Sequence, residues 1–270
     1  MISHKGWNNP LSYLISFVVT LLVGCAPALR PPAGPFSPAQ TAQLISHLRE
    51  QGQEVGSFQA VGKVRFKGKG GQSESDLFAV GRRPFKVRLE ITHPWGKPLS
   101  HIVVDEENIS VLSLTDSKFF RGPASPANTE RLFLFRLDLD SAWNILSGRV
   151  PILPHCRAVS LRPDEIILYN CQGEVVEIIS FFHGTALPKE VSLPRKWTTI
   201  ALSEFKEGDL GPYPSKIRVE KGDKAYSLEI RYKGLKLNRS IPDEVFQLNP
   251  PPGFEVITLD DHGTWSLPDF

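Results

Sequence analysis

The chain has 270 residues, with 31 basic and 29 acidic side chains and a formal net charge of +2. This balance excludes a dedicated electrostatic binder of nucleic acid, because no basic excess is present to neutralise a track of phosphates. Three cysteines are too few for a small scaffold held together by disulfides. A hydrophobic fraction of 41% is that of an ordinary globular domain, so function must be sought in particular segments.

The N-terminus has the features of a secretory signal. The uncharged stretch 11–23 is too short to span a membrane, which needs about 20 apolar residues. It ends in the string L-V-G-C at 22–25, which resembles the lipobox of bacterial lipoproteins. The resemblance implies that residues 1–24 are removed and that Cys25 is lipidated. An ordinary signal peptide next to an unrelated cysteine is the alternative. In enteric bacteria, an Asp directly after the lipidated cysteine retains a lipoprotein in the inner membrane. This chain has Ala26 at that position, which implies an outer-membrane destination.

A linker and a helix follow. The segment 25–36 combines Cys25 with a proline-rich, semi-extended spacer. Ser37 is a suitable N-cap, Pro38 suits the first helical position, and Gln40 is placed for a capping box. We therefore expect a helix from Ser37 to about residue 51.

From residue 58 the apolar residues recur with period two. Val87, Leu89 and Ile91 alternate with charged residues, which predicts a strand over 85–92 with one apolar and one wet face. Short turns between such segments predict an antiparallel meander rather than parallel strands with crossover helices. Two helices are expected to interrupt it, one from Ser125 and one capped by Asp140. The other predicted strands are 58–67, 74–82, 99–105, 109–114, 117–122, 157–162, 165–171, 174–183, 189–194, 199–206, 215–221 and 224–232.

Two cysteines are predicted to face each other. A turn over 162–165, with Pro163 at its second position, would form a hairpin in which Cys156 lies directly opposite Cys171. In an oxidising compartment this pair can form a disulfide. Two buried thiols are the alternative.

No motif indicates catalysis or metal binding. The seven histidines show no strong metal-ligand spacing, and neither a G-x-S-x-G nor a P-loop string occurs. We therefore expect no catalytic residue, no metal and no cofactor.

Pro94, Trp95 and Gly96 place a large aromatic side chain at the tip of a tight turn between two predicted strands. Such a tryptophan can fold back into the core, or it can project and partition into a membrane interface or an apolar partner.

Several short motifs, taken in order behind the lipobox, resemble the LolB-like outer-membrane lipoproteins of the LolA/LolB-like carrier superfamily. The resemblance implies a mostly β fold with some α structure. It would be a single-domain incomplete antiparallel β-barrel of about eleven strands, with a helical lid over a hydrophobic cavity. This domain would span 37–258, with 259–270 as a C-terminal tail. The segments that carry the resemblance are 58–64, 89–96, 119–122, 137–151 and 237–253.

The family implies a function. The chain would be anchored in the outer membrane facing the periplasm, bind acyl chains of lipoproteins or other lipids, and accept them from a periplasmic lipoprotein carrier. In the family the apolar tip of the protruding loop helps delivery into the membrane, a role that carries over to Trp95, within Pro94-Trp95-Gly96. The alternatives are a non-catalytic envelope assembly or sensing subunit on the same fold and, less favoured, a periplasmic hydrolase.

A curved sheet with one apolar face must cover that face, either with side chains from helices or with a ligand. Sequence leaves both possibilities open. The candidate residues lining an acyl cavity are Phe66, Phe85, Val87, Leu89, Ile91, Leu112, Phe133, Trp143 and Leu228.

Overall fold

In the computed structural model, residues 34–133 and 135–260 are described. All of them belong to one compact unit, which begins at Gly34. The lipobox and Cys25 therefore lie outside the described residues, as does most of the predicted C-terminal tail.

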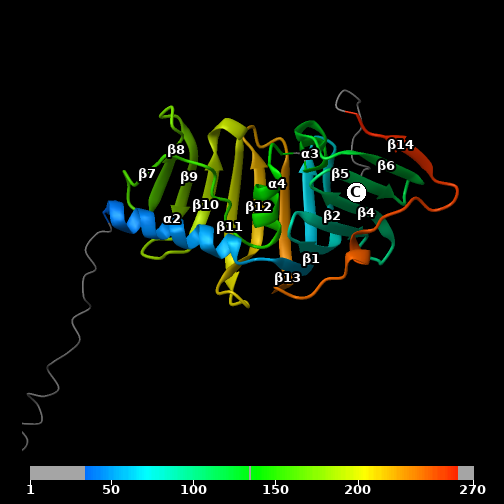
Figure 1. Cartoon of the computed structure of the whole chain (residues 1–270), viewed down its shortest axis with the longest axis horizontal. Coiled ribbons are helices and arrows are strands. Elements are labelled where there is room, and N and C mark those ends of the chain that lie inside the picture. Colours follow the sequence, from blue (N-terminus) through cyan, green and yellow to red (C-terminus); the bar gives the residue numbers. More distant parts are fainter. Residues whose placement is uncertain (1–33, 134, 261–270) are drawn as a thin grey trace, which may run out of the picture. The chain divides into compact units, whose positions relative to one another are not determined.

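Within the described residues, fourteen strands form one open sheet (Figure 1). Its order is β14-β6-β5-β4-β3-β2-β1-β13-β12-β11-β10-β9-β8-β7, and the two edge strands do not pair with each other. Neighbours are antiparallel except β14, which runs parallel to β6. The strands are β1 (Ser57–Gly68), β2 (Gly71–Arg82), β3 (Lys86–Thr92), β4 (Pro98–Asp105), β5 (Asn108–Ser113), β6 (Lys118–Pro123), β7 (Arg157–Val159), β8 (Glu165–Tyr169), β9 (Val175–Phe181), β10 (Pro188–Leu193), β11 (Thr198–Lys206), β12 (Tyr213–Lys221), β13 (Ser227–Leu237) and β14 (Glu255–Thr258).

The predicted antiparallel meander is confirmed, and every predicted strand lies in the sheet. The count of about eleven strands implied by the family resemblance is wrong. After β13 the chain continues through the short helix η2 (Asp243–Phe246) and adds β14 beside β6. This extra strand occupies backbone hydrogen-bonding groups that an edge strand would otherwise expose.

Helix α2 (Pro38–Gln53) begins at the predicted residue. The Ser37 hydroxyl accepts a hydrogen bond from the backbone N–H of Gln40, and the Gln40 side chain accepts one from the backbone N–H of Ser37. This reciprocal pair satisfies two donors that the first turn leaves open. Ile45 and Leu48 form the buried face of α2 and join the core.

Two helices, α3 (Pro126–Phe133) and α4 (Leu139–Leu146), separate β6 from β7, as predicted. The predicted cap of the second helix is wrong, since the Asp138 side chain, rather than that of Asp140, accepts a hydrogen bond from the backbone N–H of Ser141 at 2.8 Å. Asp140 lies in the first turn, where a negative charge suits the positive end of the helix. Asp138 and Asp140 both precede the apolar residues Ala142 and Trp143, so local sequence alone did not distinguish the two aspartates.

Different segments of the chain pack on the two faces of the sheet. The inner face, defined by Val87 and Leu89 of β3, carries the main core with residues of α2, α3 and α4. Figure 1 shows α2 and α4 lying across the sheet. The outer face near β3 meets the C-terminal segment, because Arg88 donates hydrogen bonds to the carbonyls of Val245 (3.1 Å) and Gln247 (3.3 Å). Val80 and Val103 flank Arg88 on this face and are buried, so both faces bury apolar side chains.

The hairpin of β7 and β8 forms, but its register differs from the prediction. Arg157 pairs with Tyr169, whereas the predicted register would pair it with Asn170, and Cys156 and Cys171 lie just beyond this last pair. The strands are joined by 160–164 instead of the predicted turn. Pro163 in this connection bridges to Pro35, a contact from outside the hairpin that local turn chemistry cannot anticipate.

Candidate functional site

The contact between α4 and the inner face is built around Trp143. This side chain is fully buried, and its ring centroid lies 5.1 Å from that of Phe58 and 6.2 Å from that of Phe85, both in edge-on geometry. The Tyr232 hydroxyl of β13 donates to the carbonyl of Leu146 at 3.0 Å, which holds the end of α4. Burial raises the pKa of the Tyr232 hydroxyl, so it remains a donor at physiological pH.

Most of the predicted cavity residues pack in the core. Five are buried on the inner face, namely Phe85, Val87, Leu89, Ile91 and Trp143. Phe133 and Leu228 are half-buried and pack against that core. Phe66 is half-buried and stacks on Tyr226, with ring centroids 6.2 Å apart. None of them lines either of the two pockets described below.

The assignment of Leu112 to the cavity is wrong. Leu112 pairs with His101, whereas Val111 pairs with Ile102, which in turn pairs with Leu89. Leu112 is therefore on the outer face. Val111 and Leu112 are adjacent and both buried, so alternation alone could not tell which of them faces inward.

Glu177 of β9 places a carboxyl group in the inner face. It is fully buried and pairs opposite Leu168. Its Oε2 accepts a hydrogen bond from the backbone N–H of Leu153 at 2.8 Å, and its Oε1 has no hydrogen-bond partner among the described residues. Burial raises the pKa of Glu177 to about 8, against partial opposition from the Leu153 N–H and from Lys196. At neutral pH the group is therefore mostly protonated and uncharged.

One pocket, of about 480 Å³, lies between α3, the start of α4 and the short helix η1 (Pro194–Lys196). We call it the Lys196 pocket. Leu137 and Leu139 contribute apolar lining, and Lys196 donates a hydrogen bond to Asp138 at 2.5 Å. Burial raises the pKa of Asp138, but hydrogen bonds from Lys196 and Ser141 outweigh burial and hold it below its ordinary value. An ion pair thus borders an apolar pocket.

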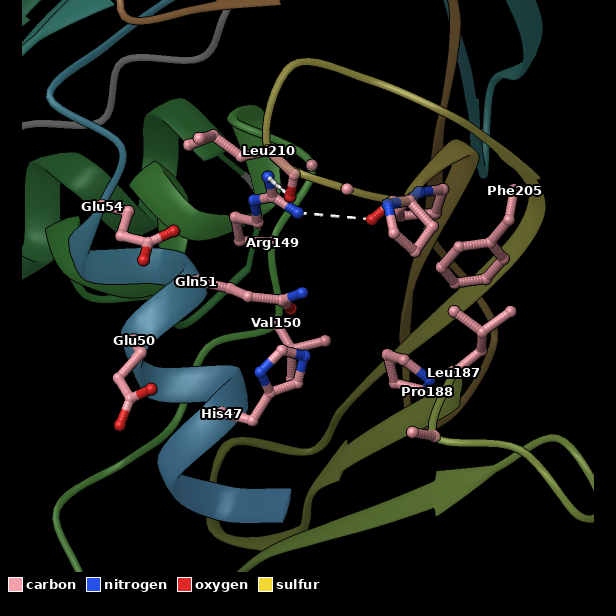
Figure 2. A pocket seen from close by; sticks show the side chains of 15 residues that line it. His47, Glu50, Gln51, Glu54, Arg149, Val150, Leu187, Pro188, Phe205 and Leu210 are labelled. Atoms are coloured by element: carbon pink, nitrogen blue, oxygen red, sulfur yellow. Dashed lines mark hydrogen bonds between the residues drawn. The ribbon is translucent and has the colours of Figure 1, made fainter. Parts of the chain in front are cut away.

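The second pocket, of about 350 Å³, lies between α2 and the strands β10 to β12 (Figure 2). We call it the Arg149 pocket. Arg149 is only 3% exposed and donates hydrogen bonds to the carbonyls of Leu210 (2.9 Å) and Pro212 (3.3 Å). Its Nε has no hydrogen-bond partner among the described residues. Burial lowers the pKa of the Arg149 guanidinium and Glu54 partly opposes this, but an arginine remains charged in a protein.

The loop between β3 and β4 projects from the sheet. Trp95 is 90% exposed and lies against His93, with ring centroids 4.7 Å apart. The N–H of Gly96 donates to the carbonyl of His93 at 2.7 Å, and Gly96 has a φ of 85°, which favours glycine. Of the two orientations that the sequence allowed, Trp95 has the projecting one.

Cys156 and Cys171 form a disulfide, with Cα atoms 5.2 Å apart. The backbone N–H of Cys156 donates to the carbonyl of Tyr169 at 2.8 Å, so the disulfide closes the hairpin just beyond its last pair.

Within 34–133 and 135–260, no helix is long and apolar enough to cross a membrane. The same residues contain no cluster of three His, Cys, Asp or Glu side chains that could hold a metal ion.

Solved structures share this fold. A LolA superfamily protein from Nitrosomonas europaea is 16% identical, with a TM-score of 0.51 over 76% of this chain and 97% of its own. A domain designated an outer-membrane lipoprotein-sorting protein from Vibrio parahaemolyticus is 10% identical, with a TM-score of 0.50 over 77% and 96%. A DUF1329 family protein from Desulfovibrio piger is 10% identical, with a TM-score of 0.52 over 76% and 95%.

No family model and no curated protein matches the sequence. At these identities the likeness concerns the fold, and the chain has a LolA/LolB-like fold. The expected mostly β fold with an incomplete, unclosed sheet is thus confirmed, although the number of strands differs.

The sequence motifs did not single out Glu177, Arg149 or Lys196. Glu177 could have been noticed, because it occupies an apolar position in the alternation of Val175, Ile179 and Phe181. Arg149 and Lys196 lie next to turns and carry no local signal of burial or pocket lining.

Proposed function

We propose that this protein is a lipid-anchored envelope protein that binds acyl chains of lipoproteins beneath its helices and passes them to the outer membrane. The observation that carries the proposal is the LolA/LolB-like sheet with helices packed on its apolar face and the Lys196 pocket opening beside them. Acyl chains need only apolar area, so the proposed activity is binding without catalysis.

The inner face supplies that area. Trp143 and its neighbours are packed in the present conformation, so chains would enter by separating α3 and α4 from the sheet. Leu137 and Leu139 lie both in the Lys196 pocket and against the core, which makes this pocket the natural entry. Burying each additional CH2 group of a ligand stabilises the complex by about 0.8 kcal/mol, which offsets the lost helix contacts.

One end of the sheet is suited to a membrane surface. The pairing register places the turns β1–β2, β3–β4 and β12–β13 at the same end of the strands, with η1 next to them. Trp95 (90% exposed) and Trp197 (68% exposed) lie there, together with the exposed Lys69, Lys97 and Lys224. Tryptophan prefers the membrane interface and lysine is attracted to anionic headgroups. This end supports a role for the Trp95 loop in delivery, and lipidation at Cys25 would keep the protein beside its target.

The test is binding and transfer of a synthetic triacylated lipopeptide by the full chain. Leu139→Ser should weaken binding several-fold, whereas the matched change Leu210→Ser, in the Arg149 pocket, should not. Trp95→Glu should slow transfer to vesicles and leave lipopeptide binding and melting temperature unchanged. Transfer at the wild-type rate would remove Trp95 from the mechanism.

A non-catalytic assembly or sensing subunit on the same fold is the second candidate. The close packing of Trp143, Phe58 and Phe85 on the inner face favours it, because a filled core needs no ligand. If the correctly folded chain shows no saturable lipopeptide binding, the role of an assembly or sensing subunit is favoured over that of a carrier.

A further inference from the structure

The Arg149 pocket contains a buried positive charge without an ion-pair partner in the described part of the chain. Two of the five guanidinium N–H groups donate to the carbonyls of Leu210 and Pro212. No carboxylate among the described residues forms an ion pair with Arg149, and its Nε–H has no acceptor. A buried charge in this condition is costly unless something compensates it.

Other hydrogen-bonding groups converge near Arg149. Figure 2 shows the His47 ring and the Gln51 carboxamide pointing from α2 into the pocket, whereas the Glu50 carboxylate points away from it. The hydroxyl of Ser46 donates to Glu50 at 2.7 Å, which agrees with this outward orientation. The side chains of His47 and Gln51 can thus donate N–H groups to an acceptor beside Arg149. Glu54 also lines the pocket and attracts the Arg149 guanidinium, but it forms no ion pair with it.

The wall opposite α2 is apolar. Leu187 and Phe205 lie across the pocket from His47 and Gln51 (Figure 2). A guanidinium with spare donors binds carboxylate or phosphate oxygens well, and an apolar wall binds hydrocarbon. A ligand that fits both parts has an anionic head and an apolar body.

We propose that the Arg149 pocket binds a small anionic amphiphile, with its carboxylate or phosphate facing Arg149, Gln51 and His47 and its hydrocarbon facing Leu187 and Phe205. This ligand class differs from the uncharged acylated cysteine of a lipoprotein. The pocket also lies at the end of the strands opposite Trp95, since Lys206 pairs with Tyr213 there. The proposal therefore stands apart from acyl transfer at the Lys196 pocket.

The experiment is a calorimetric titration of the full chain carrying Cys25→Ser, which removes the thiol that would be lipidated. The probes are octanoate, octyl phosphate, octanol and inorganic phosphate. We expect saturable binding of octanoate, octyl phosphate or both, and at least about tenfold weaker binding of octanol, because hydrogen bonds to a charged group are lost. Octanol binding as tightly as both anions would overturn the proposal. Inorganic phosphate binding as tightly as octyl phosphate would overturn its amphiphile part and leave a free-anion site.

Three variants locate the binding. Gln51→Leu and Leu187→Ser should each lower the affinity for the preferred anion by about tenfold. Glu50→Gln is the matched control on the same helix and should leave it unchanged. Arg149→Met is less informative, because Arg149 also holds the connection between β11 and β12. Unchanged affinity in Gln51→Leu and Leu187→Ser would place the ligand elsewhere and refute the assignment.

Discussion

Replacing Glu177 with Gln is expected to remove a pH dependence of stability. In the folded protein burial raises the pKa of this carboxyl group from its ordinary 4.5 to about 8. Across that interval the native state holds a proton that the unfolded chain has released, so the free energy of unfolding falls as pH rises. The stabilising contribution is complete below about pH 4.5 and is lost as pH rises through about 8.

The magnitude follows from the same shift. Each pH unit between the two pKa values changes the free energy of unfolding by about 1.4 kcal/mol, which amounts to roughly 5 kcal/mol over the whole interval. Glutamine has the same shape, can accept the N–H of Leu153 and cannot ionise. At pH 8 Glu177→Gln should therefore be more stable than the wild type by several kcal/mol. At pH 5 the two should differ by about 1 kcal/mol, the scale of one changed hydrogen bond.

The assay is urea unfolding, monitored by tryptophan fluorescence, at several pH values from 5 to 8. Glu174→Gln is a suitable control, because Glu174 is exposed and pairs with Arg195 at the surface. It should change stability by less than about 1 kcal/mol and leave the pH dependence as in the wild type. Parallel stability curves for wild type and Glu177→Gln would refute the argument that Glu177 is protonated in the folded protein.

Four further results are expected from thermal or urea unfolding. Trp143→Ala should destabilise the fold by about 3 to 5 kcal/mol, because it leaves a cavity between α4 and the sheet; a loss below about 1 kcal/mol would mean that α4 is not packed as described. Cys171→Ser should cost about 3 kcal/mol, since the disulfide links positions 15 residues apart, and a reducing agent should then have no further effect. Asp138→Ala should cost about 1 kcal/mol as a lost N-cap and Asp140→Ala less; the reverse order would contradict the observed cap. Trp95→Ala should change stability by less than about 0.5 kcal/mol, and a large loss would show that the side chain is not exposed.

The sequence by itself determined the elements of secondary structure as far as β13, whereas β14 was not predicted. Val87, Leu89 and Ile91 alternate with charged residues, and this pattern is enough to predict β3 because side chains of a strand point alternately to two faces. The capping box of Ser37 and Gln40 likewise predicts where α2 begins, since both partners lie within one turn. These signals are local, so they do not depend on how the sheet is assembled.

The tertiary structure decided which groups are buried and which of them meet. Leu112 lies on the outer face because it pairs with His101, and it is buried there although the helices pack on the other face. Arg149 reaches the carbonyls of Leu210 and Pro212, which follow it by about sixty residues in sequence. Glu177 is uncharged at neutral pH only because the surrounding core excludes water. Burial and long-range pairing are properties of the assembled fold, and no short stretch of sequence encodes them.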